Sequence, residues 1–183
     1  MKIRRKMEIQ NKVKELLLRA DIKRPPVNVK KIARILKAEI HEEKFEEDDA
    51  ISGVLIQDKN KVIIGINSAH PKTRQRFTIA HEIGHLLLHS HSGPHVDKIL
   101  PSLVRLRDDV SSLAIDEDEI ESNTFAAELL MPDFMLRKDF RELASEEMFD
   151  EADIDKLADQ YKVSIQAMTY RLINLGLITS HTS

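Results

Sequence analysis

The sequence predicts an α+β protein in which a small, mostly antiparallel three-stranded sheet packs on a helical core. Several segments repeat apolar residues at helical spacing, whereas residues 40–66 contain short β-rich runs separated by turn residues. The chain has 183 residues, of which 42% are hydrophobic and 32% are charged, and these values are ordinary for one globular domain.

The apolar pattern predicts each element in turn. Helices are expected where apolar residues recur every three or four positions: residues 5–20, 29–36, 71–89, 116–131, 153–161 and 164–175. Strands are expected in three β-rich runs: residues 40–45, 53–56 and 62–66. The turn at 58–61 joins the last two runs as a hairpin. Residues 92–116 form a long connection, with one further strand expected near 103–106.

We treat residues 1–183 as a single domain with three parts. Residues 1–37 form a basic helical N-terminal part, with 13 Lys or Arg against three acidic residues. Residues 38–131 hold the sheet and two central helices, and residues 132–183 form the C-terminal helices. A basic arm can contact an acidic partner, but we interpret it as the solvated face of an amphipathic helix.

The composition also excludes several classes of site. The chain has no cysteine, which excludes disulfides, thiolate metal sites and a cysteine nucleophile. The basic N-terminus lacks the apolar stretch of a signal peptide, and no run approaches the roughly 18 apolar residues of a membrane span. We therefore expect a cytoplasmic protein without membrane contact.

The most informative motif is H-E-x-x-H, formed by His81, Glu82 and His85 within an apolar segment. Residues four apart on a helix point in nearly the same direction, so both imidazoles can bind one metal ion. Glu82 would lie beside that ion and accept a proton from its bound water as general base. The motif predicts one Zn²⁺ per chain, with Mn²⁺ as the alternative, in a metal-dependent peptidase.

A catalytic zinc site needs a third protein ligand. His91 occupies the place of the third histidine in an extended H-E-x-x-H-x-x-G-x-x-H pattern, but Leu88 replaces the glycine at the turn. Leucine favours a continuing helix, which would carry His91 away. The helix at 116–131 offers carboxylates instead, and geometry alone leaves three of them open: Glu119, Glu121 and Glu128.

Further side chains have two interpretations each. Arg74 and Arg76 can stabilise an oxyanion or, as we favour, anchor the start of their helix by salt bridges. Asn123 can hydrogen-bond a ligand histidine or pack as a polar core residue.

Two segments resemble the ImmA/IrrE family of metallopeptidases: RQRFTIAHEIGHLLLH at 74–89 and ESNTFAAELLMP at 121–132. Three shorter matches extend the resemblance over nearly the whole chain: RPPVNVKKIA at 24–33, ISGVL at 51–55 and IGIN at 64–67. The resemblance implies a zincin-like core and endopeptidase activity. It also implies that the glutamate opening the E-A-N-x-F-A element is the third ligand, which here falls on Glu121. Ser122 replaces the alanine of that element.

The resemblance further implies a protein substrate, since such proteins often cleave a helix-turn-helix repressor in stress-response or mobile-element regulation. One alternative is a catalytically silent, metal-containing regulator that binds its partner. A second is a DNA-binding regulator, because residues 154–172 resemble a helix-turn-helix. That segment offers Arg171 as a cation, but its first helix carries acidic residues that suit an anionic duplex poorly. We expect no direct nucleic-acid binding, and the sequence specifies no oligomeric state.

Overall fold

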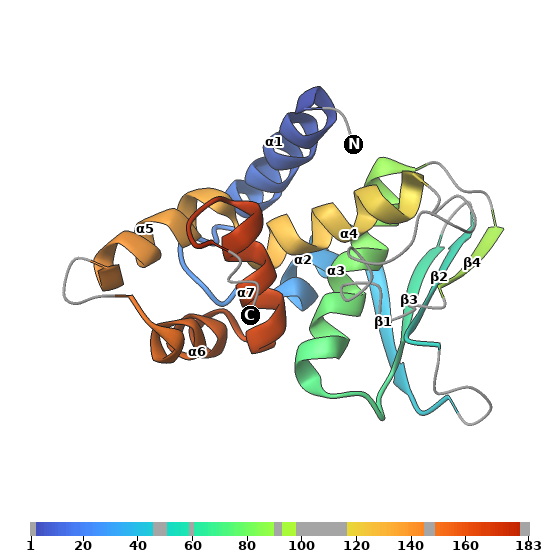
Figure 1. Cartoon of the computed structure of the whole chain (residues 1–183). Helices are drawn as coiled ribbons and strands as arrows, with labels where there is room; N and C mark the ends of the chain where they lie inside the picture. Colours follow the sequence, from blue (N-terminus) through green and yellow to red (C-terminus); the bar gives the residue numbers. More distant parts are fainter. Residues whose placement is uncertain are drawn as a thin grey trace, which may run out of the picture.

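The computed structural model describes residues 3–45, 51–58, 61–89, 93–97, 117–144 and 149–179. Across these ranges the chain forms seven helices and one four-stranded sheet, which confirms the α+β class (Figure 1). The helices are α1 (Ile3–Arg19), α2 (Val29–Ile35), α3 (Lys72–Leu88), α4 (Glu117–Leu130), α5 (Asp133–Ala144), α6 (Glu151–Tyr161) and α7 (Ile165–Asn174). The strands are β1 (Ala38–Glu43), β2 (Gly53–Asp58), β3 (Lys61–Asn67) and β4 (Gly93–Asp97).

The sheet is mixed, with the strand order β1-β3-β2-β4. Strands β2 and β3 form the expected antiparallel hairpin, in which Asp58 pairs with Lys61, and β2 is also antiparallel to β4. Strand β1 is parallel to β3, which lies between β1 and β2 in the sheet although it follows both of them in the sequence. The sequence did not predict this parallel pair or β4, whose Gly-Pro start is atypical of a strand. The strand expected near 103–106 lies outside the described residues.

Helix α3 lies at the centre of the fold, in contact with α4, α2 and the strands β2 and β3 (Figure 1). Its burial follows from a sequence that is apolar on most sides. Gly84 is the point of closest approach to α4, since a Cβ placed there would lie 3.0 Å from Cα of Ser122 and 3.3 Å from Cβ of Phe125. Glycine therefore lets the two helices pack backbone to backbone, beside the H-E-x-x-H motif.

The start of α3 is held by hydrogen bonds to neutral groups. Arg74 Nη2 donates to Ser52 Oγ at 2.7 Å, and Arg76 Nε donates to the carbonyl oxygen of Lys162 at 3.1 Å. Gln75 Nε2 donates to the carbonyl oxygen of His70 at 2.7 Å. These contacts agree with an anchoring role for Arg74 and Arg76. Their partners are hydroxyl and carbonyl oxygens, however, and not the carboxylates of the expected salt bridges.

The C-terminal helices pack onto the core through buried polar contacts. Arg171 of α7 pairs with Glu128 of α4, and its Nε donates to the carbonyl oxygen of Met131 at 3.0 Å. The hydroxyl of Tyr161, at the end of α6, donates to Asp139 Oδ2 at 2.7 Å. Helix α5, which supplies Asp139, was missed by the sequence analysis, whereas α6 and α7 begin and end within two residues of their predicted limits. Among the described helices, none combines the length and apolar character of a membrane span.

Candidate metal centre

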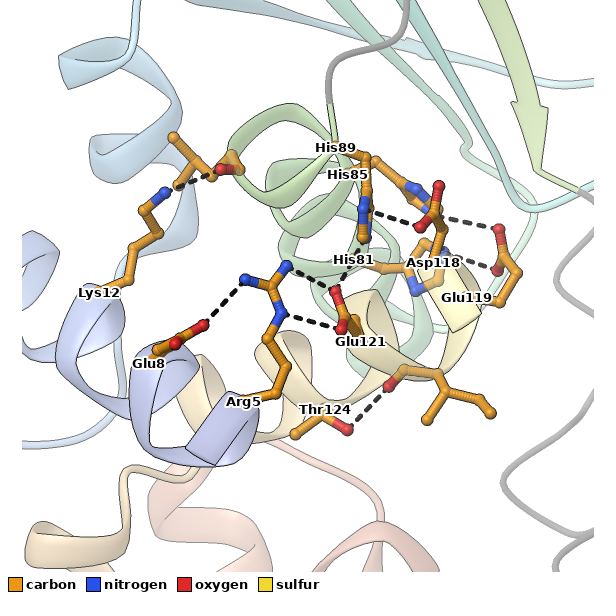
Figure 2. Close-up of polar contacts among 12 residues, drawn as sticks. Arg5, Glu8, Lys12, His81, His85, His89, Asp118, Glu119, Glu121 and Thr124 are labelled. Atoms are coloured by element: carbon orange, nitrogen blue, oxygen red, sulfur yellow. Dashed lines mark hydrogen bonds and ion pairs between the residues drawn. The ribbon is translucent and has the colours of Figure 1, made fainter. Parts of the chain in front are cut away.

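Two imidazoles of the H-E-x-x-H motif face one another on α3. His81 and His85 lie one turn apart, and their Nε2 atoms are separated by 2.9 Å. Both side chains are almost completely buried, with 1% and 0% of their surface exposed. The helical spacing predicted from sequence therefore brings the two rings together, and Figure 2 shows them beside the start of α4.

A carboxylate from the first turn of α4 completes the cluster. Glu119 Oε2 lies 3.3 Å from His81 Nε2, and Glu119 Oε1 lies 3.1 Å from His85 Nε2. One ligand atom from each of the three residues lies within 4.8 Å of the others. Within the described residues, no other group of three His, Asp or Glu side chains brings its ligand atoms this close together.

The surroundings of this cluster suit a cation. Burial raises the pKa of Glu119, but hydrogen bonds and charge from His81 and His85 outweigh burial and lower that pKa below its usual value. His81 Nδ1 lies 3.0 Å from Oδ1 of Asn123. An amide oxygen can only accept, so Nδ1 carries a proton, and in the neutral ring Nε2 is then the nitrogen whose lone pair can bind a metal. This is the contact to a ligand histidine that the sequence offered as one role for Asn123.

The other two candidate carboxylates of α4 point elsewhere. Glu121, the ligand implied by the family resemblance, accepts hydrogen bonds from Arg5 Nε at 2.8 Å and Arg5 Nη2 at 2.7 Å. Glu128 forms the buried pair with Arg171. Positions 119 and 121 differ by about 200° around a helix axis, so the two carboxylates project from different faces of α4. Of the three residues left open, the structure brings only Glu119 to the histidines.

The expected general base lies on the side of α3 that faces the sheet. Glu82 is fully buried, with 0% of its surface exposed. A Cβ added at Gly53 of β2 would lie 2.6 Å from Glu82 Oε1 and would also collide with Thr78. Glycine at this position therefore lets β2 approach the Glu82 carboxylate more closely than any side chain would allow.

Comparison with known proteins places the chain in a family. A family model described as the IrrE N-terminal-like domain, peptidase M78, matches residues 33–173. The chain belongs to this family. Among curated proteins, the "Uncharacterized immunity region protein 2" of Bacillus phage phi105 is 33% identical over 86 residues, covering 47% of this chain and 48% of that protein. The match thus spans about half the length of this curated relative.

Membership of the M78 peptidases confirms the resemblance found in the sequence and places the metal cluster within the matched range. Helix α1 lies outside that range, yet it contributes contacts beside the cluster. Arg5 bonds to Glu121, and Lys12 Nζ donates to the carbonyl oxygen of Leu87 at 2.8 Å. Neither residue could be singled out from the sequence, because no local pattern connects Arg5 or Lys12 to a partner more than 70 positions away.

Two further histidines, His89 and His91, follow the H-E-x-x-H motif in the sequence. Helix α3 ends at Leu88, and the next residue, His89, has an extended backbone. His89 Nδ1 lies 2.9 Å from Asp118 Oδ1, so this ring contacts the first turn of α4 beside Glu119. His91, the alternative ligand weighed from sequence, lies outside the described residues.

Proposed function

We propose that this M78 family member is a zinc-dependent endopeptidase, with His81, His85 and Glu119 as metal ligands and Glu82 as general base. The observation that carries the proposal is the convergence of two imidazole nitrogens and a carboxylate from a separate helix within 4.8 Å. Two imidazoles and one carboxylate form the donor set of many catalytic zinc sites, which keep a further position open. The buried, pre-oriented Nε2 atom of His81 supports the same assignment.

Zinc in such a site acts as a Lewis acid that acidifies a water molecule and polarises the peptide carbonyl. The chain supplies the proton transfers. We assign the proton of the attacking water to Glu82, which follows His81 directly in the H-E-x-x-H motif and whose buried carboxylate lies against β2. The same carboxylic acid then returns the proton to the nitrogen of the leaving amine. Asn123 keeps His81 in the tautomer that presents Nε2 to the metal.

Placing Glu119 in the ligand set, and not Glu121, departs from the assignment that the family resemblance implied. The support is positional, because Glu119 oxygens lie 3.1 and 3.3 Å from the two Nε2 atoms. Glu121 already makes two hydrogen bonds to Arg5, and the nearest imidazole paired with it is that of His89, at 3.8 Å.

We propose a helix-turn-helix transcriptional repressor as substrate, cleaved in the cytoplasm during stress response or mobile-element regulation. Support comes from the peptidase family, which implies a protein substrate, and from the relative named as a phage immunity region protein. Direct DNA binding is disfavoured, because Arg171, the cation expected on the second helix of the pair, is buried against Glu128. The acidic residues of α6 would also repel a duplex.

The test compares the wild-type protein with Glu82→Gln and His85→Ala. Zinc content is measured by elemental analysis, and cleavage is measured by mass spectrometry on a proteome-derived peptide library, which requires no known substrate. We expect wild-type protein to bind zinc and cut, Glu82→Gln to bind zinc without cutting, and His85→Ala to lose both. A wild-type protein that binds zinc but cuts no peptide or co-expressed repressor would instead favour the catalytically silent regulator.

A further inference from the structure

The first turn of α4 carries the third member of the metal cluster, and side chains from two other segments contact it. His89 Nδ1 lies 2.9 Å from Asp118 Oδ1 and His89 Nε2 lies 3.8 Å from Glu121 Oε2, while Arg5 donates to Glu121 at 2.7 and 2.8 Å. These contacts hold one face of the turn, and Glu119 faces His81 and His85 from another. Figure 2 shows the arrangement, with Arg5 reaching Glu121 from a separate helix.

This turn needs external support because of its place in the helix. The first four N–H groups of a helix have no partner within it, so the first turn is the part that frays most readily. Glu119 is the third residue of α4 and belongs to that turn. The turn is also crowded with acidic side chains, since Glu117, Asp118 and Glu119 follow one another and Glu121 comes two positions later. Asp118 and Glu121 are three positions apart and share a helix face, so their like charges repel unless a cation balances them.

Arg5 supplies such a cation in a well-defined geometry. Two parallel N–H···O bonds from one guanidinium to one carboxylate fix its orientation as well as its distance. The Glu121 side chain is only 15% exposed, so this pair is less screened by water than a surface ion pair. Lys12, two turns further along α1, bonds to the carbonyl oxygen of Leu87 at the end of α3. Helix α1 thus connects the ends of the two helices that carry the cluster.

We propose that Arg5 is a positioning residue for the metal centre, which holds the first turn of α4 through Glu121 so that Glu119 faces His81 and His85. This inference rests on the proposed metal site. It assigns a role at that site to α1, which lies outside the family-matched residues 33–173. Arg5 itself contacts neither the imidazoles nor any reacting group.

The experiment measures zinc affinity by chelator competition for the full-length protein and three variants. Arg5→Ala is expected to weaken zinc binding about tenfold, at the lower end of the loss seen when an outer hydrogen bond of a metal site is removed. Arg4→Ala is the matched control, because Arg4 lies on the same helix and its ion pair, at 3.2 Å, is with Glu8. It removes the same charge and is expected to leave the affinity unchanged.

Glu121→Gln should weaken zinc binding as Arg5→Ala does, and the double variant should be no weaker than either single variant, because both changes break the same contact. Visible absorption of the Co²⁺-loaded proteins gives a second readout, since it reports ligand geometry and is insensitive to general stability. We expect the Arg5→Ala spectrum to differ from the wild-type spectrum and the Arg4→Ala spectrum to match it.

The possible results separate the two proposals. Wild-type affinity and an unchanged Co²⁺ spectrum in Arg5→Ala would overturn the role of Arg5 while leaving the peptidase proposal intact. Equal loss in Arg4→Ala and Arg5→Ala would also overturn it, because bulk charge would then be the cause. If Arg5→Ala does not fold, Glu121→Gln, which keeps the shape of the side chain, decides the question together with Glu119→Ala, because a larger loss of zinc affinity in Glu119→Ala excludes Glu121 as the ligand. A wild-type protein without zinc affinity would overturn both proposals.

Discussion

Oε1 of Glu119 lies 3.1 Å from Nε2 of His85, and this contact joins the first turn of α4 to the centre of α3. Because the Glu121 carboxylate is bonded to Arg5 on another face of α4, the two glutamates should differ in their effect on the metal. We expect Glu119→Ala to lower zinc affinity by more than the roughly 10–100-fold typical of an outer hydrogen bond.

Glu121→Ala provides the comparison, and we expect it to retain stoichiometric zinc at saturating metal with about tenfold weaker affinity. Elemental analysis measures the zinc content of the two variants after dialysis. The reverse order, with zinc lost in Glu121→Ala and kept in Glu119→Ala, would assign the ligand to the residue that the family resemblance implied.

Asn123 should contribute to metal binding through His81, since its amide oxygen lies 3.0 Å from His81 Nδ1. We expect Asn123→Ala to weaken zinc binding about 10–100-fold, because His81 loses the acceptor that fixes its tautomer. Asn123→Asp should restore much of the affinity, since a carboxylate also accepts this hydrogen bond. Thr124→Ala is the matched control, because the neighbouring Thr124 hydroxyl donates to the carbonyl oxygen of Ile120, at 2.7 Å, in its own helix. Chelator competition measures all three variants.

Gly84→Ala should push α3 and α4 apart. A Cβ at this position would lie 3.0 Å from Cα and 3.2 Å from the carbonyl oxygen of Ser122, and backbone atoms cannot move aside cheaply. We expect a loss of about 1–3 kcal/mol in the free energy of unfolding, measured by urea denaturation, together with weaker zinc binding.

Gly65→Ala is the control for this substitution, since its new Cβ would meet no atom closer than 3.8 Å. Its free energy of unfolding should change by less than about 1 kcal/mol. Equal effects of the two substitutions would show that helix contact is not the cause.

The Arg171–Glu128 pair predicts a non-additive effect on stability. Both side chains are 5% exposed, so removal of one partner leaves a buried charge without its counterion. We expect Arg171→Met alone to lower the free energy of unfolding by about 3–5 kcal/mol. The double variant Arg171→Met with Glu128→Leu should lower the free energy of unfolding by less than either single variant does. Additive losses in a urea double-mutant cycle would contradict this interpretation.

The buried phenol of Tyr161 should make the stability of the fold depend on pH in the alkaline range. Burial, together with the hydrogen bond to Asp139, raises the pKa of its phenol above the ordinary value of 10.0. The neutral phenol therefore stabilises the fold fully below about pH 10, and this contribution falls as pH rises further, because only the unfolded chain can then ionise. We expect the stability advantage of wild type over Tyr161→Phe to be constant near pH 8 and to shrink above about pH 10. Urea denaturation of both proteins across this range measures the difference, and an advantage independent of pH would rule out the phenol as its source.

The sequence by itself determined what depends on local spacing. Four positions along a helix separate His81 from His85, so the two rings had to share a face once that helix formed. Alternating and β-rich runs likewise located the β2–β3 hairpin, and the apolar stripe of α1 is buried as its spacing requires. Helix α5 was missed because the sequence analysis did not carry the helical pattern beyond Pro132, although α5 begins at the next residue, Asp133.

Only the tertiary structure decided which distant groups meet. Spacing alone left three glutamates of α4 open, and the family resemblance pointed to Glu121. In the packed structure Glu119 faces the histidines, and the other two glutamates pair with Arg5 and Arg171. The parallel pairing of β1 with β3 was decided in the same way, by a chain crossover that leaves no local pattern. The physical reason is that residue spacing fixes the angle between side chains of one element, whereas the rotation of one element against another depends on packing between segments far apart in the chain.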